Sequence, residues 1–380
     1  MRWGILLCKF ADLPQEPFTL QFARDLIAGN GSLREYWTDM SFGKLETVIA
    51  FAEGWNTLSL TLNDFRPLSR GDRIAQCFAD FQNRPHPPAG IPPFDRVIVF
   101  INGVIDSGSA NGNILIDPLA VRPTFIAHEM GHALGLDHSF DTNAVSWDKN
   151  SDGRPGAYGS SFDIMSAEAF GGLPATFATR LGAAGPGLNA LTRERLGWLP
   201  ESKTSTIRHN PGEDVSVPVS VGALDNRALP ASALVKVTSG GSVNGAPLPA
   251  MTYLVEFRPK TGWDAGTSGD AVVIHMVREG DVARIARSAA ASQAWQPNST
   301  FTDQARGVAI SVVSVATDKS TANIVVSTGA RARLSVMSVR KTLGHRFDLK
   351  AGLRAISPAA PFRADSVRDR LLDNPPQLGP

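Results

Sequence analysis

The chain has 380 residues, which is more than one hydrophobic core usually spans and suits two domains with additional segments. Hydrophobic residues make up 43% of it and charged residues 19%, which predicts a folded globular protein and excludes a largely disordered one. The net charge of +1 argues against a dedicated nucleic-acid surface. Without an apolar run of about 18 residues, no transmembrane helix is predicted.

The chain contains two cysteines, Cys8 and Cys77, which are too few for a disulfide framework. We expect both to be buried free thiols, although their spacing leaves a single bridge between them open. The apolar run within residues 1–10 is too short for a signal peptide and lacks a clear cleavage site, so we interpret it as a strand. The residues themselves therefore leave the cellular compartment undetermined.

Helix and strand signals alternate over the first 120 or so residues. Helical spacing is expected at 18–28, 32–40 and 71–81, and Ser32 with Glu35 matches a capping box. Strands are expected at 44–62, 95–101 and 112–117. We predict that strand 112–117 forms the edge of a sheet, where it would align an extended peptide by backbone pairing.

Residues 128–138 read HEMGHALGLDH and match the pattern H-E-x-x-H-x-x-G-x-x-H. On a helix that begins near Pro123, His128 and His132 are four residues apart, so both imidazoles project from one face and can bind one ion. Gly135 permits a left-handed turn that returns His138 as a third nitrogen ligand. Three protein ligands and an open fourth position are typical of catalytic zinc. The sequence therefore predicts zinc at these histidines.

Glu129 lies one position round the helix, close enough to activate a water molecule but too far to bind the metal itself. We expect it to act as the general base in peptide-bond hydrolysis and to pass the proton to the departing amine. The alternative is an amphipathic core helix with hydrogen-bonded histidines, because Ile126, Leu134 and Leu136 give the helix an apolar side. The completeness of the pattern favours the metal site.

A polar stretch follows the histidines and has the beginnings of a calcium loop. Asp148, Asn150 and Asp152 alternate before a glycine, as oxygen ligands do in such loops. A complete EF-hand would need an acidic residue where Gly159 stands, so we do not expect one. The three residues are candidate ligands of a looser calcium site completed from elsewhere, and the alternative is an ordinary polar turn.

Further along, Asp163-Ile164-Met165-Ser166 follows the histidine pattern. Together with that pattern, this segment resembles the metzincin clan of metallopeptidases, in which a turn bearing a methionine lies beneath the three histidines. The resemblance implies that Met165 is a soft apolar floor for the ligands and does not bind zinc. Astacin-type members carry a tyrosine two residues beyond the methionine, where this chain has Ala167, so no tyrosine of this turn is expected to assist.

The resemblance narrows to gametolysin-type and immune-inhibitor-A-type peptidases. Residues 32–45, 195–199 and 253–258 look like segments of those families, and His138 fits the gametolysin pattern better. The similarity covers residues 4–327 at the level of motifs. It implies a metzincin-like mixed sheet with a zinc helix, protein or peptide substrates, and secretion from the cell.

After Pro200 the pattern changes to short strands separated by turn residues. A helix is expected just before, at 188–199, and strands at 215–221, 233–238, 252–258, 271–277, 308–315 and 321–327. Such regular spacing is typical of a β-sandwich. Residues 328–380 hold ten Arg or Lys against four Asp or Glu and read as a basic tail or appendage.

These observations predict an α+β zinc peptidase domain over 1–200, an all-β sandwich-like domain over 201–327 and a basic tail over 328–380. The expected function is a zinc-dependent endopeptidase acting on proteins or peptides. Two alternatives remain: a binding or adhesion protein that uses the β-domain, and an effector directed by its basic tail to an acidic surface. The natural substrate and the oligomeric state do not follow from the residues.

Overall fold

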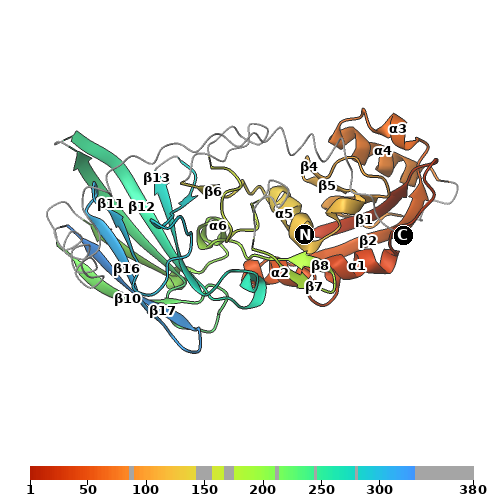
Figure 1. Cartoon of the computed structure of the whole chain (residues 1–380). Coiled ribbons are helices and arrows are strands. Elements are labelled where there is room, and N and C mark those ends of the chain that lie inside the picture. The colour runs from red at the N-terminus through yellow and green to blue at the C-terminus, as the bar shows by residue number, and fades with distance from the viewer. Residues whose placement is uncertain are drawn as a thin grey trace.

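The computed structural model describes residues 1–84, 90–142, 156–166, 175–209, 214–243, 246–278 and 281–329. Two groups of elements lie next to each other in Figure 1, a five-stranded sheet with helices at one end and two further sheets at the other. Within the described ranges, no helix combines the length and hydrophobicity that crossing a membrane requires. Apart from Thr328 and Gly329, the predicted basic tail lies outside these ranges.

A mixed sheet organises the N-terminal part, with the strand order β2-β1-β3-β5-β4. Four of its strands are parallel: β1 (Arg2–Lys9), β2 (Val48–Thr57), β3 (Arg96–Ile101) and β5 (Asn113–Ile116). The short β4 (Gly108–Ala110) runs antiparallel to β5. Because side chains alternate across a strand, Trp3 and Ile5 enter one core and Leu6 enters another.

Helices cover both faces of this sheet. On the face of Ile5 pack α1 (Leu20–Ala28), α2 (Leu33–Met40) and α5 (Pro123–Ala133). On the face of Leu6 pack α3 (Leu62–Phe65) and α4 (Arg70–Gln82). Cys8 and Cys77 are buried and free, as expected. The pKa of the Cys77 thiol is raised, mainly because the thiol is buried and to a smaller extent because Cys8 lies next to it.

The predicted edge strand is not the edge of the sheet. β5 is paired with β3 on one side and with β4 on the other, so the edge strands of this sheet are β4 and β2. Asn111 and Gly112 join β4 to β5 with positive φ angles of 50° and 77°. An Asn-Gly pair is a strong hairpin signal, but β4 has too few residues to show the alternating pattern of a strand.

Two helix predictions also differ from the structure. Ser32 is the N-cap of α2, but its side chain makes no capping hydrogen bond. The Glu35 carboxylate accepts from the amide of Gly31, whereas a capping box would require the amide of Ser32. The helix predicted at 188–199 is shorter, since α6 spans Ala190–Arg195. It ends there because Gly197 takes a φ of 67°, the left-handed conformation that closes a helix.

Two sheets form the C-terminal part, with the strand orders β6-β14-β13-β12-β11-β9 and β10-β17-β16-β15. Their strands are β6 (Phe140–Asp141), β9 (Thr204–His209), β10 (Ser216–Gly222), β11 (Leu234–Val243), β12 (Ala246–Arg258), β13 (Ala271–Arg278), β14 (Arg284–Ile285), β15 (Thr300–Asp303), β16 (Val308–Val315) and β17 (Thr321–Thr328). Apolar side chains of both sheets, such as Val255 and Ile310, share one buried cluster, as in a β-sandwich.

Smaller elements lie between the two parts or at their margins. A two-stranded sheet consists of β7 (Phe177–Thr179) and β8 (Gly182–Ala184), and short 3₁₀ turns occur at Pro118–Ala120, Glu201–Lys203 and Gly262–Asp264. One strand joins the parts directly, because β6 follows His138 in the chain yet pairs in parallel with β14 of the larger sheet. The segment after the third histidine is therefore hydrogen-bonded to the C-terminal part.

Candidate metal centre

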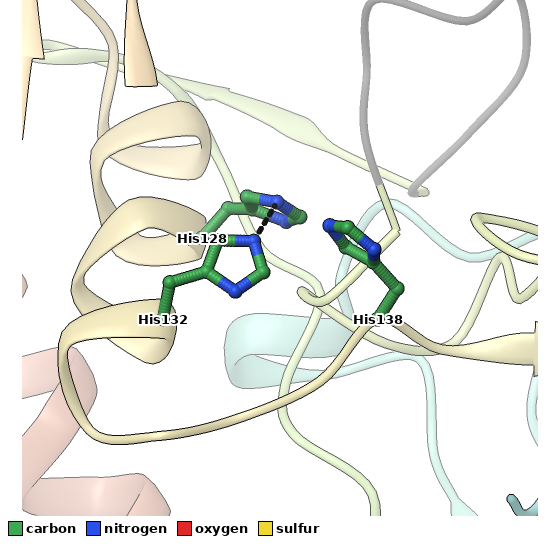
Figure 2. A group of neighbouring side chains, drawn as sticks. All are labelled: His128, His132 and His138. Carbon is green, nitrogen blue, oxygen red and sulfur yellow. Dashed lines mark hydrogen bonds between the residues drawn. The ribbon is translucent and has the colours of Figure 1, made fainter. Parts of the chain in front are cut away.

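Helix α5 places two of the three histidines. It begins at Pro123, whose fixed φ and missing amide suit the first turn of a helix. His128 and His132 project from the same face, and the turn through Gly135, with a φ of 81°, brings His138 opposite them (Figure 2). One candidate ligand atom of each histidine lies within 4.8 Å of the other two. The structure thus brings the three predicted ligands together.

Hydrogen bonds orient the first two imidazoles. Nδ1 of His128 lies 2.9 Å from the carbonyl oxygen of Ile164, and Nδ1 of His132 lies 2.9 Å from that of Leu136. A carbonyl oxygen can only accept, so each Nδ1 carries the ring proton and each Nε2 keeps a lone pair. The two Nε2 atoms face each other at 3.0 Å, as the dashed line in Figure 2 shows. Two lone pairs at this distance repel unless a proton or a metal ion lies between them.

Burial favours the neutral, metal-binding form of His128 and His138. It lowers the pKa of His128, and the nearby charge of Glu129 only partly offsets this effect. It also lowers the pKa of His138 to about 2, with His128 and His132 adding to the effect. Neutral imidazole nitrogens are common ligands of transition metals. The donor set therefore fits a divalent ion.

Glu129 is buried on α5, and the positively charged side chain of Arg70 is close enough to interact with its carboxylate electrostatically. Burial alone would lower the pKa of Arg70, but Asp106 raises it, and the charges of Glu129 and Tyr158 raise it further. The guanidinium of Arg70 donates to both carboxylate oxygens of Asp106, at 2.8 and 3.0 Å, and to the carbonyl of Ser109 in β4. Arg70 has no place in the histidine pattern, so no sequence signal pointed to it.

The turn that contains Met165 contacts both ends of the ligand segment. The carbonyl of Ile164 accepts the hydrogen bond from His128, and the carbonyl of Met165 accepts from the amide of Ser139 at 3.0 Å. Met165 is buried, and its thioether approaches Gly131 of α5 so closely that a side chain there would overlap it. The turn therefore lies directly against α5.

Asp163 holds this turn to α6, a role that no sequence pattern suggested. Its side chain is fully buried, and Oδ1 accepts from the amide of Met165 at 2.8 Å. Oδ2 accepts from the amide of Asn189 at 3.2 Å and from the Asn189 side chain. Asn189 in turn caps α6 by accepting from the amide of Thr192. One carboxylate thus joins two segments.

Tyr158 is an aromatic neighbour of the histidines that was not predicted. Its ring centroid lies 3.9 Å from that of His138 and 6.3 Å from that of His128. Its φ of 60° is a left-handed conformation that few residues with a side chain adopt. No periodic pattern in the sequence predicts this contact, because it depends on how the loop 156–161 folds back onto His138.

Some predicted positions lie outside the described residues. These are the candidate calcium ligands Asp148, Asn150 and Asp152, and Ala167 beyond the methionine. The calcium site thus stays a prediction.

A cavity of about 370 Å³ opens beside His138. The loop 135–140 and α6 line it, and Arg195 and His275 contribute polar groups to its wall. His275 is buried, and its Nε2 lies 3.6 Å from the Glu256 carboxylate. Of the three histidines of the triad, only His138 borders the cavity.

No protein-family model matches the chain, and no curated protein matches it. Among solved structures, the chain is similar to wild-type OgpA from Akkermansia muciniphila, with 12% sequence identity and a TM-score of 0.33. The match covers 75% of this chain and 91% of that chain. A TM-score this low carries no argument about fold or function. The likeness to metzincins rests on the motifs alone.

Proposed function

We propose that this protein is a zinc-dependent endopeptidase of metzincin type that hydrolyses peptide bonds of proteins. His128, His132 and His138 are the zinc ligands, and Glu129 is the general base. The proposal joins the five matching positions of the sequence pattern to the arrangement of the three imidazoles in space.

One observation carries this proposal. The Nε2 atoms of His128 and His132 lie 3.0 Å apart, and both Nδ1 atoms face carbonyl oxygens. In an amphipathic core helix with satisfied histidines, at least one of the facing nitrogens would carry a proton or find an acceptor. Two facing lone pairs instead favour a bound cation, and imidazole nitrogens select transition metals over Ca²⁺ or Mg²⁺. Among these metals, a three-histidine site with an open position is typical of catalytic zinc.

Held by His128, His132 and His138, a zinc ion would supply Lewis-acid chemistry towards a peptide carbonyl and an attacking water molecule. The chain supplies the proton transfers, because Glu129 is buried next to a ligand and its carboxylate can accept the proton of the water. The same carboxylate then donates that proton to the departing amine. The carbonyls of Ile164 and Leu136 keep two imidazoles in the tautomer that leaves Nε2 free.

Of the two edges of the N-terminal sheet, the one next to α5 is the place where an extended substrate would align. This edge is β4, which packs next to α5. Exposed backbone groups of an edge strand pair readily with an added peptide strand. The strand that would align the substrate is therefore β4, residues 108–110, and not the expected strand 112–117.

Metal analysis combined with cleavage of a peptide library, with and without a chelator, tests this function. Glu129→Ala should retain stoichiometric zinc but cleave at least about 10²-fold more slowly, the usual effect of losing a general base. Glu201→Ala, an exposed glutamate at a 3₁₀ turn, is the control and should cleave at the wild-type rate. Undiminished cleavage by Glu129→Ala would falsify the base assignment, and a folded wild-type protein without bound metal would refute the function as a whole.

A further inference from the structure

The three histidines are not held in the same way. Nδ1 of His128 and Nδ1 of His132 each hydrogen-bond to a backbone carbonyl. Nδ1 of His138 is buried, and no described residue provides it with a hydrogen-bond partner. An imidazole that binds a metal needs an outer contact that sets the orientation of its ring. For His138, this contact must be of another kind.

The ring of Tyr158 makes that contact. The two ring centroids are 3.9 Å apart, with an angle of 43° between the planes, and the His132 ring meets His138 edge-on at 4.7 Å. The third imidazole is thus confined between two aromatic neighbours. Tyr158 keeps its left-handed φ of 60°, a conformation that costs free energy and persists only where the surroundings enforce it.

The C-terminal part enforces it through Gln293. This side chain is 6% exposed and donates to the carbonyl of Gly159, the residue after Tyr158. Its Oε1 accepts from the amide of Ser161 at 2.8 Å and also from the Ser161 hydroxyl. One amide group therefore holds the loop at two positions beyond Tyr158.

Asp141 holds the same loop from β6. Its amide donates to the carbonyl of Gly156 at 2.9 Å, and its carboxylate accepts from Gln293 at 3.3 Å and from Nε of Arg287 at 2.8 Å. The Asp141 side chain is 2% exposed, so these charged hydrogen bonds are shielded from water. β6, the loop of Tyr158 and the segment from Arg287 to Gln293 are thus one connected unit.

We propose that Tyr158 is the positioning residue of His138, and that Gln293 and Asp141 keep Tyr158 in place, so that the C-terminal β-sheets are a structural part of the metal centre. The inference rests on the proposed function, because it takes the three histidines to be metal ligands. It assigns the orientation of the third ligand to the ring of Tyr158 and not to its hydroxyl group.

Zinc affinity measured by competition with a chromophoric chelator tests the inference without any substrate. Tyr158→Leu should weaken zinc binding by about tenfold or more, the usual effect of removing an outer contact of a ligand. Tyr158→Phe keeps the ring and should bind zinc as the wild type does. Gln293→Ala should weaken zinc binding. Gln296→Ala is the control from the same segment as Gln293. It removes a hydrogen bond to the carbonyl of Asp270 and should leave zinc binding unchanged.

Circular dichroism of each variant establishes that it is folded before its affinity is compared. Wild-type affinity in both Tyr158→Leu and Gln293→Ala would overturn the inference while leaving the proposed function intact. An equal loss in Tyr158→Phe and Tyr158→Leu would overturn it too, because the hydroxyl would then be the acting group. If the folded wild type binds no zinc, the proposed function itself fails.

Discussion

Gly131 lies in the last turn of α5, between the two helical histidines, and its missing side chain lets the methionine turn approach. A Cβ on this residue would overlap the thioether of Met165, which is buried. Helix propensity alone would favour alanine over glycine here by about 1 kcal/mol. The close contact opposes this preference, because inserting atoms into a packed core costs about 1–3 kcal/mol.

Gly131→Ala should therefore lower the free energy of unfolding, by up to about 2 kcal/mol once the gain in helix propensity is subtracted. Urea unfolding monitored by circular dichroism measures the change. Gly54→Ala is the matched control, because a Cβ at Gly54 meets nothing within 4 Å. If Gly131→Ala were as stable as that control, the methionine turn would not press on the helix as described.

At the scale of the elements, Asp163 joins two segments next to the metal centre. Its carboxylate accepts from the amide of Met165 in the methionine turn and from the amide of Asn189 at the N-cap of α6. It reinforces a backbone hydrogen bond between these segments, from the amide of Ile164 to the carbonyl of Gly187. The turn supports His128 through the Ile164 carbonyl. Disturbing Asp163 therefore reaches the metal centre through one intermediate residue.

Asp163→Ala should destabilise the fold by about 3 kcal/mol or more, because it leaves the amides of Met165 and Asn189 buried without an acceptor. Asp163→Asn keeps one acceptor oxygen and should lie between this variant and the wild type. Thermal and urea unfolding of the three proteins, together with their zinc affinities, measure the series. Equal stability of the Ala and Asn variants would contradict the assigned hydrogen bonds.

At the scale of the whole molecule, a buried ion-pair network joins the N-terminal and C-terminal parts. Arg258 is fully buried and donates to Glu256 at 3.0 Å and to Asp264 at 2.6 and 2.7 Å. The carboxylate of Glu256 accepts from the amide of Ala190 in α6, and that of Asp264 accepts from the amide of Gly187. Strand β12 is thereby tied to the segment that follows the methionine turn.

This network predicts a loss of stability in acid. Burial alone would raise the pKa of Glu256, but Arg258 and then His275 lower it to about 2. In the unfolded chain the pKa of a glutamate is about 4.3. Because the folded value is the lower one, the contribution of Glu256 is complete above pH 4.3 or so and is lost as the pH falls towards 2. The loss over this window is about 3 kcal/mol.

Comparison with Glu256→Gln isolates this effect, since glutamine does not titrate and every other group is common to both proteins. The free energy of unfolding is measured for both between about pH 6 and about pH 2. The advantage of the wild type over the variant should shrink as the solution becomes more acidic. A difference between the two proteins that does not depend on pH would show that Glu256 is not held as the carboxylate.

The residues alone determined the features that depend on short-range geometry. The spacing of His128, His132 and His138 was enough to predict that they meet, because helix pitch and one glycine turn set their separation. Alternating apolar residues predicted most of the strands, because successive side chains of a strand point to opposite faces of the sheet. The hairpin at Asn111-Gly112 and the end of α6 before Gly197 are also encoded locally, by residues that adopt positive φ angles.

Only the tertiary structure decided which distant residues complete the centre. Tyr158, Asp163 and Gln293 reach it from segments separated along the chain, and β6 leaves the histidine motif to join the sheet of the C-terminal part. Such contacts arise from packing that satisfies buried polar groups across the whole molecule. No local pattern encodes them, because each residue involved would be equally acceptable on a surface loop.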